Sequence, residues 1–156
     1  MGGTVSSRAT QDERAVFTHP KTKSLTAPII CYESIYGAFV AEQCNKGATL
    51  LCIITNDGWW GNTPGHRQHN QFAALRAIET RKYVVRSGNT GISSVWNSSG
   101  ECIKQLGYDT KGVLTAKVPL IKGKTLYVRF GDYLGWVTVA VFLILVVIRF
   151  RIPKNV

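Results

Sequence analysis

The sequence predicts an α/β domain followed by a single membrane-spanning helix, and three observations carry that prediction. Short apolar runs alternate with stretches of helical periodicity, in the order strand, helix, strand, helix, strand. Turn residues then separate several short apolar runs, which is typical of hairpins that close a parallel sheet with antiparallel strands. Residues 134–148 carry no charge in a chain whose net charge is +10. At 156 residues and 45% hydrophobic, the chain supports one core and is not a disordered basic tail.

The first elements of the domain follow an irregular segment. Residues 1–24 are polar and without a period, so we expect no regular structure there. Residues 27–31 form an apolar run that predicts a buried strand, and residues 34–46 have helical spacing that ends before Gly47. Cys31 therefore falls where a strand gives way to a helix. We place the folded domain at residues 25–130.

The middle of the chain predicts the rest of the sheet. Residues 48–55 are continuously apolar, as in a strand that is covered on both faces. The loop at 56–65 is rich in turn residues yet carries Trp59 and Trp60, and a surface loop rarely holds such bulk without a pocket or partner to cover. An apolar stripe predicts a helix at 66–82. The expected strands after it lie at residues 83–87, 92–96, 102–106 and 113–118.

The C-terminal apolar run predicts a bilayer crossing. Residues 134–148 would span about 22 Å as a helix, less than the roughly 30 Å hydrocarbon core. Aromatic residues before the run and Arg149 and Arg151 after it extend the crossing, so we predict a transmembrane helix at residues 131–150. Three basic and no acidic residues lie in the last eight positions, which places residues 151–156 in the cytoplasm and the domain outside it. The alternative, a buried core helix, leaves those basic residues unexplained.

Charge and cysteine patterns narrow the function further. Basic residues are scattered singly without alternating aromatic residues, which argues against nucleic acid as a partner and fits a domain beside anionic lipid headgroups. The four cysteines contain no C-x-x-C pair, and His66 and His69 have no third ligand spaced with them, so no metal site and no cofactor are indicated. Disulfide bonds among the four cysteines remain an alternative if the domain faces an oxidising compartment. Arg76, Glu79, Arg81 and Arg86 are expected to form a structural ion-pair network.

Cys31 is the best candidate nucleophile. A thiol at the end of a buried strand lies where the amides of a following helix stabilise a thiolate and an oxyanion. A buried structural cysteine is the alternative on position alone. Tyr32 and Glu33 follow directly and put a phenol and a carboxylate beside the thiol. Glu33 can also satisfy free amides at the start of the helix.

At these residues the sequence resembles a known family. The run IICYES, then ITNDGWWGNTPG, then HRQHNQFAALRAIETRKYVVRSGNTGIS resemble, in order, the C-terminal half of apolipoprotein N-acyltransferases, inner-membrane members of the nitrilase superfamily. The likeness covers about residues 15–156, including the YVRFGDY segment before the last helix. It implies the C-terminal half of a four-layer αββα sandwich, followed by one transmembrane helix. Cys31 matches the nucleophile, and Tyr32 and Glu33 match the essential pair beside it. Trp59 matches the Trp of the flexible loop over the active site, and both Trp59 and Trp60 are expected to bind substrate.

The resemblance also implies substrates and a location. A phospholipid is the acyl donor, Cys31 carries the acyl chain as a thioester, and the acceptor is the amine of a lipoprotein's N-terminal diacylglyceryl-cysteine. The domain is expected on the periplasmic side of the bacterial inner membrane. Superfamily members also use a Glu base and a Lys on segments before the cysteine strand, and here only Asp12, Glu13, Lys21 and Lys23 precede it. The chain therefore resembles a C-terminal fragment that is inert alone.

Two other functions remain open from the sequence. A soluble amidase of the same superfamily would not need the apolar run at 134–148 or the two loop tryptophans. A membrane-tethered remnant without catalysis would explain the missing Glu and Lys. Hydrophobic spans and acid/base segments encoded upstream would separate the acyltransferase from the remnant.

Overall fold

The computed structural model describes residues 13–151. Residues 1–12 and 152–156 lie outside it. Asp12, half of the N-terminal segment and most of the expected cytoplasmic tail therefore fall outside the described residues.

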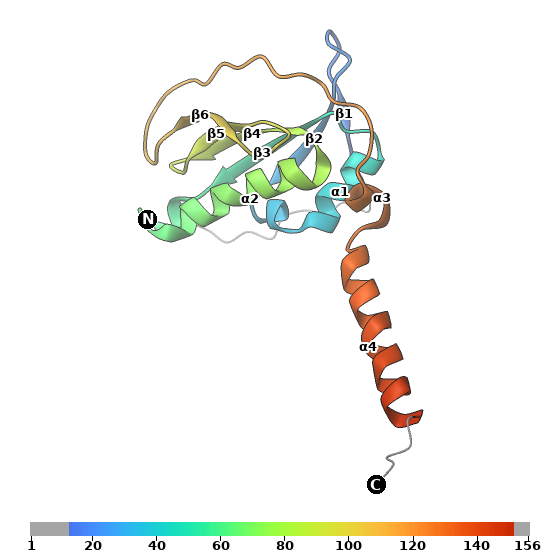
Figure 1. The fold of residues 1–156 in the computed structure, drawn as a ribbon. Helices are drawn as coiled ribbons and strands as arrows, with labels where there is room; N and C mark the ends of the chain where they lie inside the picture. The colour runs from blue at the N-terminus through green and yellow to red at the C-terminus, as the bar shows by residue number, and fades with distance from the viewer. Residues whose placement is uncertain (1–12, 152–156) are drawn as a thin grey trace.

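A single mixed sheet forms the centre of the domain, and its strands lie side by side in the order of the sequence (Figure 1). The three middle strands β2, β3 and β4 run parallel, while β1 at one edge and β5 and β6 at the other are antiparallel to their neighbours. The strands are β1 (Phe17–Thr18), β2 (Leu25–Ile30), β3 (Leu50–Asn56), β4 (Tyr83–Asn89), β5 (Ser93–Trp96) and β6 (Cys102–Leu106). The prediction of an α/β sheet that ends in antiparallel strands is confirmed.

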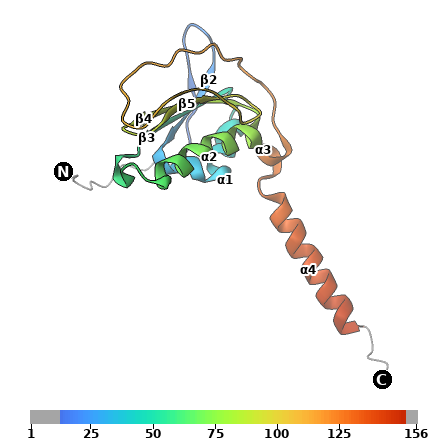
Figure 2. The same cartoon turned by 60° about the vertical axis from the view of Figure 1, so that its left-hand side comes forward.

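Two helices cover one face of the sheet (Figure 2). α1 (Gly37–Asn45) and α2 (Pro64–Thr80) connect the parallel strands, because parallel neighbours can only be joined by a crossover. Alternate residues of β2, β3 and β4 are buried under these helices and form the core. Its fully buried members include Ala27, Ile29, Val40, Leu51, Ala73, Ala77 and Val84.

α2 begins and ends at residues suited to those positions. Thr63 caps its N-terminus by accepting a hydrogen bond from the amide of Gly65, and Pro64 occupies the first turn, where its missing N–H costs nothing. Arg81 ends the helix in a left-handed conformation, with φ of 54°. The chain then turns directly into β4, so the end of α2 fixes where that strand begins.

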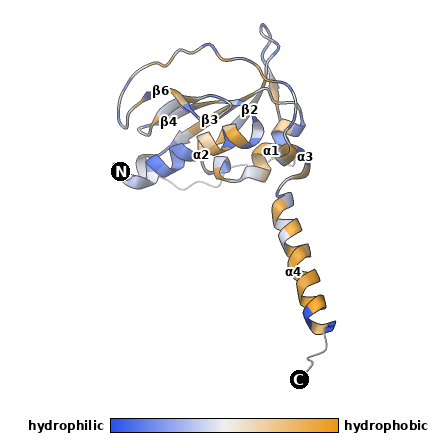
Figure 3. Ribbon diagram, viewed as in Figure 1, coloured by the Kyte–Doolittle hydropathy of each residue, from blue (hydrophilic) through white to orange (hydrophobic). Residues whose placement is uncertain are grey.

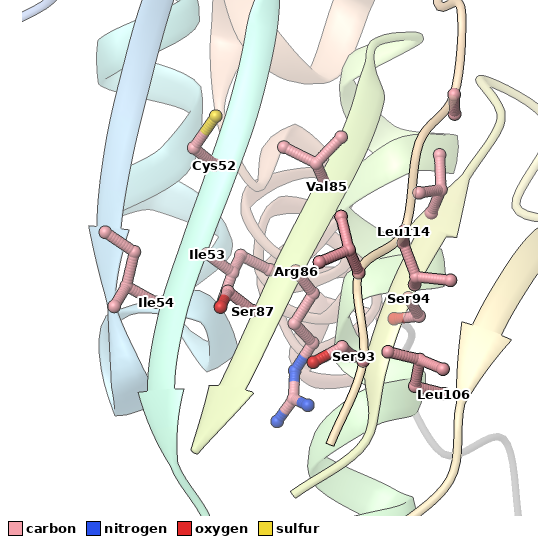
Figure 4. A pocket seen from close by; sticks show the side chains of 14 residues that line it. Cys52, Ile53, Ile54, Val85, Arg86, Ser87, Ser93, Ser94, Leu106 and Leu114 are labelled. Atoms are coloured by element: carbon pink, nitrogen blue, oxygen red, sulfur yellow. The ribbon is translucent and has the colours of Figure 1, made fainter. Parts of the chain in front are cut away.

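The second face of the sheet is crossed by a long irregular segment, residues 107–125, which we call the strap (Figure 2). The expected strand at 113–118 is wrong, because the strap passes over the face of the sheet and pairs with no strand there. Val113 is 89% exposed. Between strap and sheet lies a cavity of about 530 Å³, lined by residues that include Cys52, Val85 and Leu114 (Figure 4).

The strap covers this face only in part. Ile54 in β3 is 54% exposed, although its continuously apolar strand predicted cover on both faces. Among the described residues, one face of β3 is therefore packed against helices while the other is largely open. A sheet with helices on one side and an apolar face on the other is half of a sandwich.

The C-terminal helix leaves the domain through a short attached turn. α3 (Leu126–Phe130) buries Val128 in the core, and Thr125 caps it while donating a hydrogen bond of 2.6 Å to the carbonyl of Glu79. α4 (Tyr133–Arg151) then projects away, apolar along nearly its whole length (Figure 3). It is long and apolar enough to cross a membrane, and its most apolar stretch is not buried against the domain.

Candidate active site

Cys31 lies at the carboxyl end of β2, on the first position of a short 3₁₀ turn, η1 (Cys31–Ile35). Its φ of 51° puts a non-glycine residue in the left-handed region, a conformation that costs on the order of 1 kcal/mol and persists only when neighbours hold it. Ser34 supplies one such contact, since its hydroxyl donates to the carbonyl of Cys31 over 2.8 Å. The thiol is only partly buried.

The two residues after Cys31 have different surroundings. A carboxylate oxygen of Glu33 accepts a hydrogen bond of 2.6 Å from the amide of Ile30, so Glu33 stabilises the turn that carries the thiol. The amide-satisfying role foreseen for Glu33 is thus present. Tyr32 is 50% exposed, and its ring lies 5.7 Å from the ring of Trp60.

The two loop tryptophans point to different environments. Both lie in the 3₁₀ turn η2 (Gly58–Trp60), directly after β3. Trp60 packs against Tyr32 and, edge-on at 5.4 Å, against His69. Trp59 is 71% exposed and lies on the outside of the turn. Of the two indoles, Trp60 forms a wall of the site and Trp59 faces solvent.

A buried polar cluster lies behind Cys31, and sequence reasoning did not find it. Asp57 is fully buried and accepts hydrogen bonds from His69 over 2.9 Å and from the guanidinium of Arg86. Burial alone would raise the pKa of Asp57. The hydrogen bonds from His69 and Arg86, the charge of Arg86 and the hydroxyl of Thr55 together lower it to about 2. Asp57 is therefore an ionised carboxylate throughout the physiological range.

Thr55 joins this cluster to the thiol. Its hydroxyl lies 2.9 Å from a carboxylate oxygen of Asp57 and 3.3 Å from Sγ of Cys31. His69 approaches Cys31 from α2, and its Nε2 lies 3.3 Å from the carbonyl oxygen of Cys31. The signal in the sequence was the polar TND at the end of the apolar run, because carboxyl ends of neighbouring parallel strands meet at one edge of a sheet.

The turn between β4 and β5 closes the cluster. A Cβ on Gly91 would lie 2.5 Å from a carboxylate oxygen of Asp57, so only glycine lets the backbone pass this close. Arg86 also donates to the carbonyl of Ile92 in this turn. The NTGIS run noted in the sequence thus shapes the site through its backbone.

The other three cysteines lack these surroundings. Burial raises the pKa of both Cys44 and Cys52 to about 11, which keeps them as thiols. Burial also raises the pKa of Cys102, on the edge strand β6. All four cysteines are free, and only Cys31 begins a turn at the end of a parallel strand.

His66 pairs with Asn62 and His69 with Asp57, and within residues 13–151 no three metal-binding side chains come together. One expectation about charged side chains is corrected, because the arginines form no single network. Arg76 pairs with Glu79 at 2.9 Å and Arg86 with the carboxylate behind the thiol, while Arg81 donates to the carbonyl of Ser98.

Comparison with known proteins identifies the family. The family model described as Carbon-nitrogen hydrolase matches residues 4–124. The chain belongs to the carbon-nitrogen hydrolase family. Within it, the chain is similar to the apolipoprotein N-acyltransferase of Rhodopseudomonas palustris, with 40% identity over 128 residues that cover 82% of this chain and 24% of that protein. The chain spans about a quarter of the length of the curated relatives it matches.

Solved structures of the family share the fold. Saccharomyces cerevisiae Nit3, a member of the nitrilase superfamily, superposes with a TM-score of 0.52 at 17% identity, over 64% of this chain and 39% of its own. An amidase from Nesterenkonia sp. AN1, with the acetamide moiety of fluoroacetamide added covalently at its active-site cysteine, gives the same TM-score, identity and coverage. The expected nitrilase-like fold is confirmed.

Proposed function

We propose that this chain is the acyl-carrying C-terminal part of an apolipoprotein N-acyltransferase. The observation that carries the proposal is the placement of Cys31, on a left-handed turn at the end of β2, in a chain about 40% identical to proteins of that name. The domain at residues 25–130 would hold the nucleophile, and the helix at 131–150 would hold it at the inner membrane.

The reaction proceeds in two transfers. The thiolate of Cys31 attacks the ester carbonyl of a phospholipid, the acyl–oxygen bond breaks, and the departing alkoxide takes a proton to give a lysophospholipid. The α-amine of the lipoprotein's diacylglyceryl-cysteine then attacks the thioester. The carbon–sulfur bond breaks, an amide forms, the amine loses a proton to a base, and the thiolate is restored.

The neighbouring residues have distinct roles in this proposal. Glu33 holds the turn through the amide of Ile30, and Tyr32 with Trp60 forms an aromatic wall against which an acyl chain packs. Trp59, exposed on the same loop, reaches toward lipid. These residues are therefore assigned to substrate contact and to support of the nucleophile.

The membrane supplies the acyl donor. α4 begins three residues after α3 ends, and α3 is attached to the domain through Val128 and Thr125, so the domain is tethered close to the bilayer. Arg149 and Arg151 at the far end favour a cytoplasmic C-terminus, which puts the domain on the periplasmic side. The donor is a phospholipid and the acceptor an apolipoprotein; neither nucleic acid nor a cofactor enters the proposal.

The general base and the oxyanion cation come from outside these residues. Glu13 is an exposed partner of Lys46, and Lys21 and Lys23 are exposed on the turn before β2. None of the three contacts the Cys31 turn. We therefore infer that a Glu and a Lys from the rest of the longer protein complete the site.

An activated acyl donor tests the nucleophile without needing that base. The full chain, in detergent and with Cys102→Ser to remove the exposed thiol, is treated with a p-nitrophenyl ester of a fatty acid. We expect one alkali-labile adduct, mapped by mass spectrometry to Cys31 and absent in Cys31→Ala. The matched control Cys52→Ala should keep the adduct. An adduct that survives in Cys31→Ala would exclude Cys31 as the acyl carrier.

A further inference from the structure

The polar cluster behind Cys31 contacts that residue at two atoms. Thr55 reaches its sulfur over 3.3 Å, and His69 reaches its carbonyl oxygen over 3.3 Å. Both side chains are bonded to the same carboxylate oxygen of Asp57, each over 2.9 Å. One buried carboxylate is thus connected to both the reacting atom and the backbone of the nucleophile.

The hydroxyl of Thr55 has a single proton and two acceptors for it. When Cys31 is a thiol, the hydroxyl donates to Asp57 and accepts from the S–H group. When Cys31 is a thiolate, the same hydroxyl can rotate and donate to the sulfur. Asp57 tolerates the loss because His69 and Arg86 still donate to its two oxygens.

His69 has a defined orientation in this cluster. Since an ionised carboxylate only accepts hydrogen bonds, Nδ1 of His69 carries a hydrogen and donates it to Asp57. Nε2 then lies 3.1 Å from the hydroxyl of Ser34, which itself contacts the carbonyl of Cys31. His69 therefore packs against the left-handed turn at the same time as its Nδ1 donates to Asp57.

The charges around the thiol make a neutral donor valuable. The titratable and charged side chains that face this turn are Glu33 and Tyr32 from η1, Asp57 from the end of β3, His69 from α2 and Arg86 from β4. The carboxylates of Glu33 and Asp57 disfavour a negative charge on the sulfur, and the charge of Arg86 is already paired with Asp57. The uncharged hydroxyl of Thr55 contacts the sulfur beside these groups and adds no charge of its own.

We propose that Thr55 is a further catalytic residue, whose hydroxyl donates a hydrogen bond to the thiolate of Cys31. Asp57 and His69 act through that hydroxyl as positioning residues. Thr55 keeps its own proton throughout, and the thiol proton leaves to a base outside the cluster. This inference rests on the proposed function, because it takes Cys31 as the nucleophile.

The pH dependence of alkylation tests the role of Thr55 in the chain as it stands. The full chain in detergent, again with Cys102→Ser, reacts with iodoacetamide, the sulfur displacing iodide, and mass spectrometry follows the Cys31 peptide. In Thr55→Val we expect the midpoint of the pH–rate profile to rise by about one pH unit, so that alkylation at pH 7 slows about tenfold. Thr55→Ser should stay within about threefold of the parent chain.

A matched threonine separates this effect from a loss of packing. Thr49 is also buried and makes two hydrogen bonds, to the amide and carbonyl of Leu25, away from the thiol. Thr49→Val should leave the profile of Cys31 unchanged. If circular dichroism shows that the Thr55→Val chain does not fold, Thr55→Ala provides the same test with a smaller side chain.

His69→Phe tests the positioning role, because it keeps a ring beside Tyr32 and Trp60 but removes the donor to Asp57. Asp57 then holds the Thr55 hydroxyl more strongly, and alkylation of Cys31 at pH 7 should slow about fivefold. In a Thr55→Val background the same substitution should change the rate by less than about twofold, because the hydroxyl is already gone.

The outcomes distinguish this inference from the function on which it rests. If Cys31 in the parent chain reacts no faster than Cys52, the proposed nucleophile itself is wrong. If Cys31 reacts fast but a folded Thr55→Val or Thr55→Ala chain keeps the parent profile, the role of Thr55 is overturned and the proposed function stands. Full additivity of His69→Phe with Thr55→Val would overturn the positioning role alone.

Discussion

Asp57 gives the site a measurable dependence on pH. Its pKa in the folded chain is about 2, against an ordinary value of 3.8, so folding favours its ionised form. The resulting stabilisation is complete above about pH 4 and is lost as the pH falls toward 2, because the carboxylate must then take up a proton. Each pKa unit corresponds to about 1.4 kcal/mol, so the effect amounts to about 2 kcal/mol.

Urea unfolding between pH 2 and pH 5 measures this contribution. Asp57→Asn should flatten the pH dependence and destabilise the chain by about 3 kcal/mol at pH 7, since it leaves the guanidinium of Arg86 buried without a charge partner. Asp109→Asn, at an exposed position on the strap, is the control and should behave as the parent chain. Equal pH dependence in both variants would contradict the placement of Asp57.

Single residues were predictable where one element decided their position. Cys31 could be found because a strand and a helix meet at it, and Glu33 because the start of a helix attracts carboxylates. Thr55, Asp57 and His69 could not be assembled in advance. Their contacts depend on the register of β3 beside β2 and on which face of α2 turns inward, and neither is encoded locally.

At the scale of elements, the η2 loop places two adjacent tryptophans in different environments, which the sequence pattern does not distinguish. Trp59 is 71% exposed on the loop, whereas Trp60 is packed against Tyr32. In vesicles whose acyl chains carry bromine, a quencher of indole fluorescence, we expect Trp59→Phe to reduce the quenched part of the emission. Trp96→Phe, in the core, should leave the quenched part unchanged. Unaltered quenching in Trp59→Phe would show that Trp59 does not reach lipid.

Local patterns predicted most elements, but they missed β1 (Phe17–Thr18), which lies in the segment expected to be irregular, and they wrongly predicted a strand at residues 113–118. Apolar runs and turn residues located β2 to β6, α1 and α2 within a few residues. The run at 113–118 has the composition of a strand, but a strand needs a neighbouring backbone to pair with. The strap instead crosses the face of the sheet, and its path depends on tertiary packing against that face, which the local sequence pattern does not reveal.

For the whole molecule, the direction of α4 decides the compartment of the site. A reporter fused after Val156 should behave as a cytoplasmic one, because Arg149 and Arg151 end the helix on that side. Green fluorescent protein would fluoresce there and alkaline phosphatase would be inactive. The opposite pair of results would put the domain in the cytoplasm and contradict the proposed acceptor. The same reporters fused before Met1 provide the internal control and should give the reverse pattern.

We also expect the isolated chain to show no turnover with phospholipid and a lipopeptide acceptor. A general base and an oxyanion cation each contribute about 10²-fold or more to such transfers, and Glu13, Lys21 and Lys23, the described candidates before the cysteine strand, do not contact the Cys31 turn. Product analysis by mass spectrometry checks this directly. Sustained turnover that disappears in Cys31→Ala would mean that a base lies within the chain after all.

The order of the strands bears on how the protein is made. Every strand of the sheet pairs with the strand that precedes it in the sequence, so each new strand meets a partner that has already been synthesised. Short separations between partners lower the entropy lost in closing loops and favour fast folding. The sheet can therefore assemble one strand at a time as the chain emerges from the ribosome or translocon. Stalled chains of increasing length should gain protease resistance in steps, one for each strand from β3 onward.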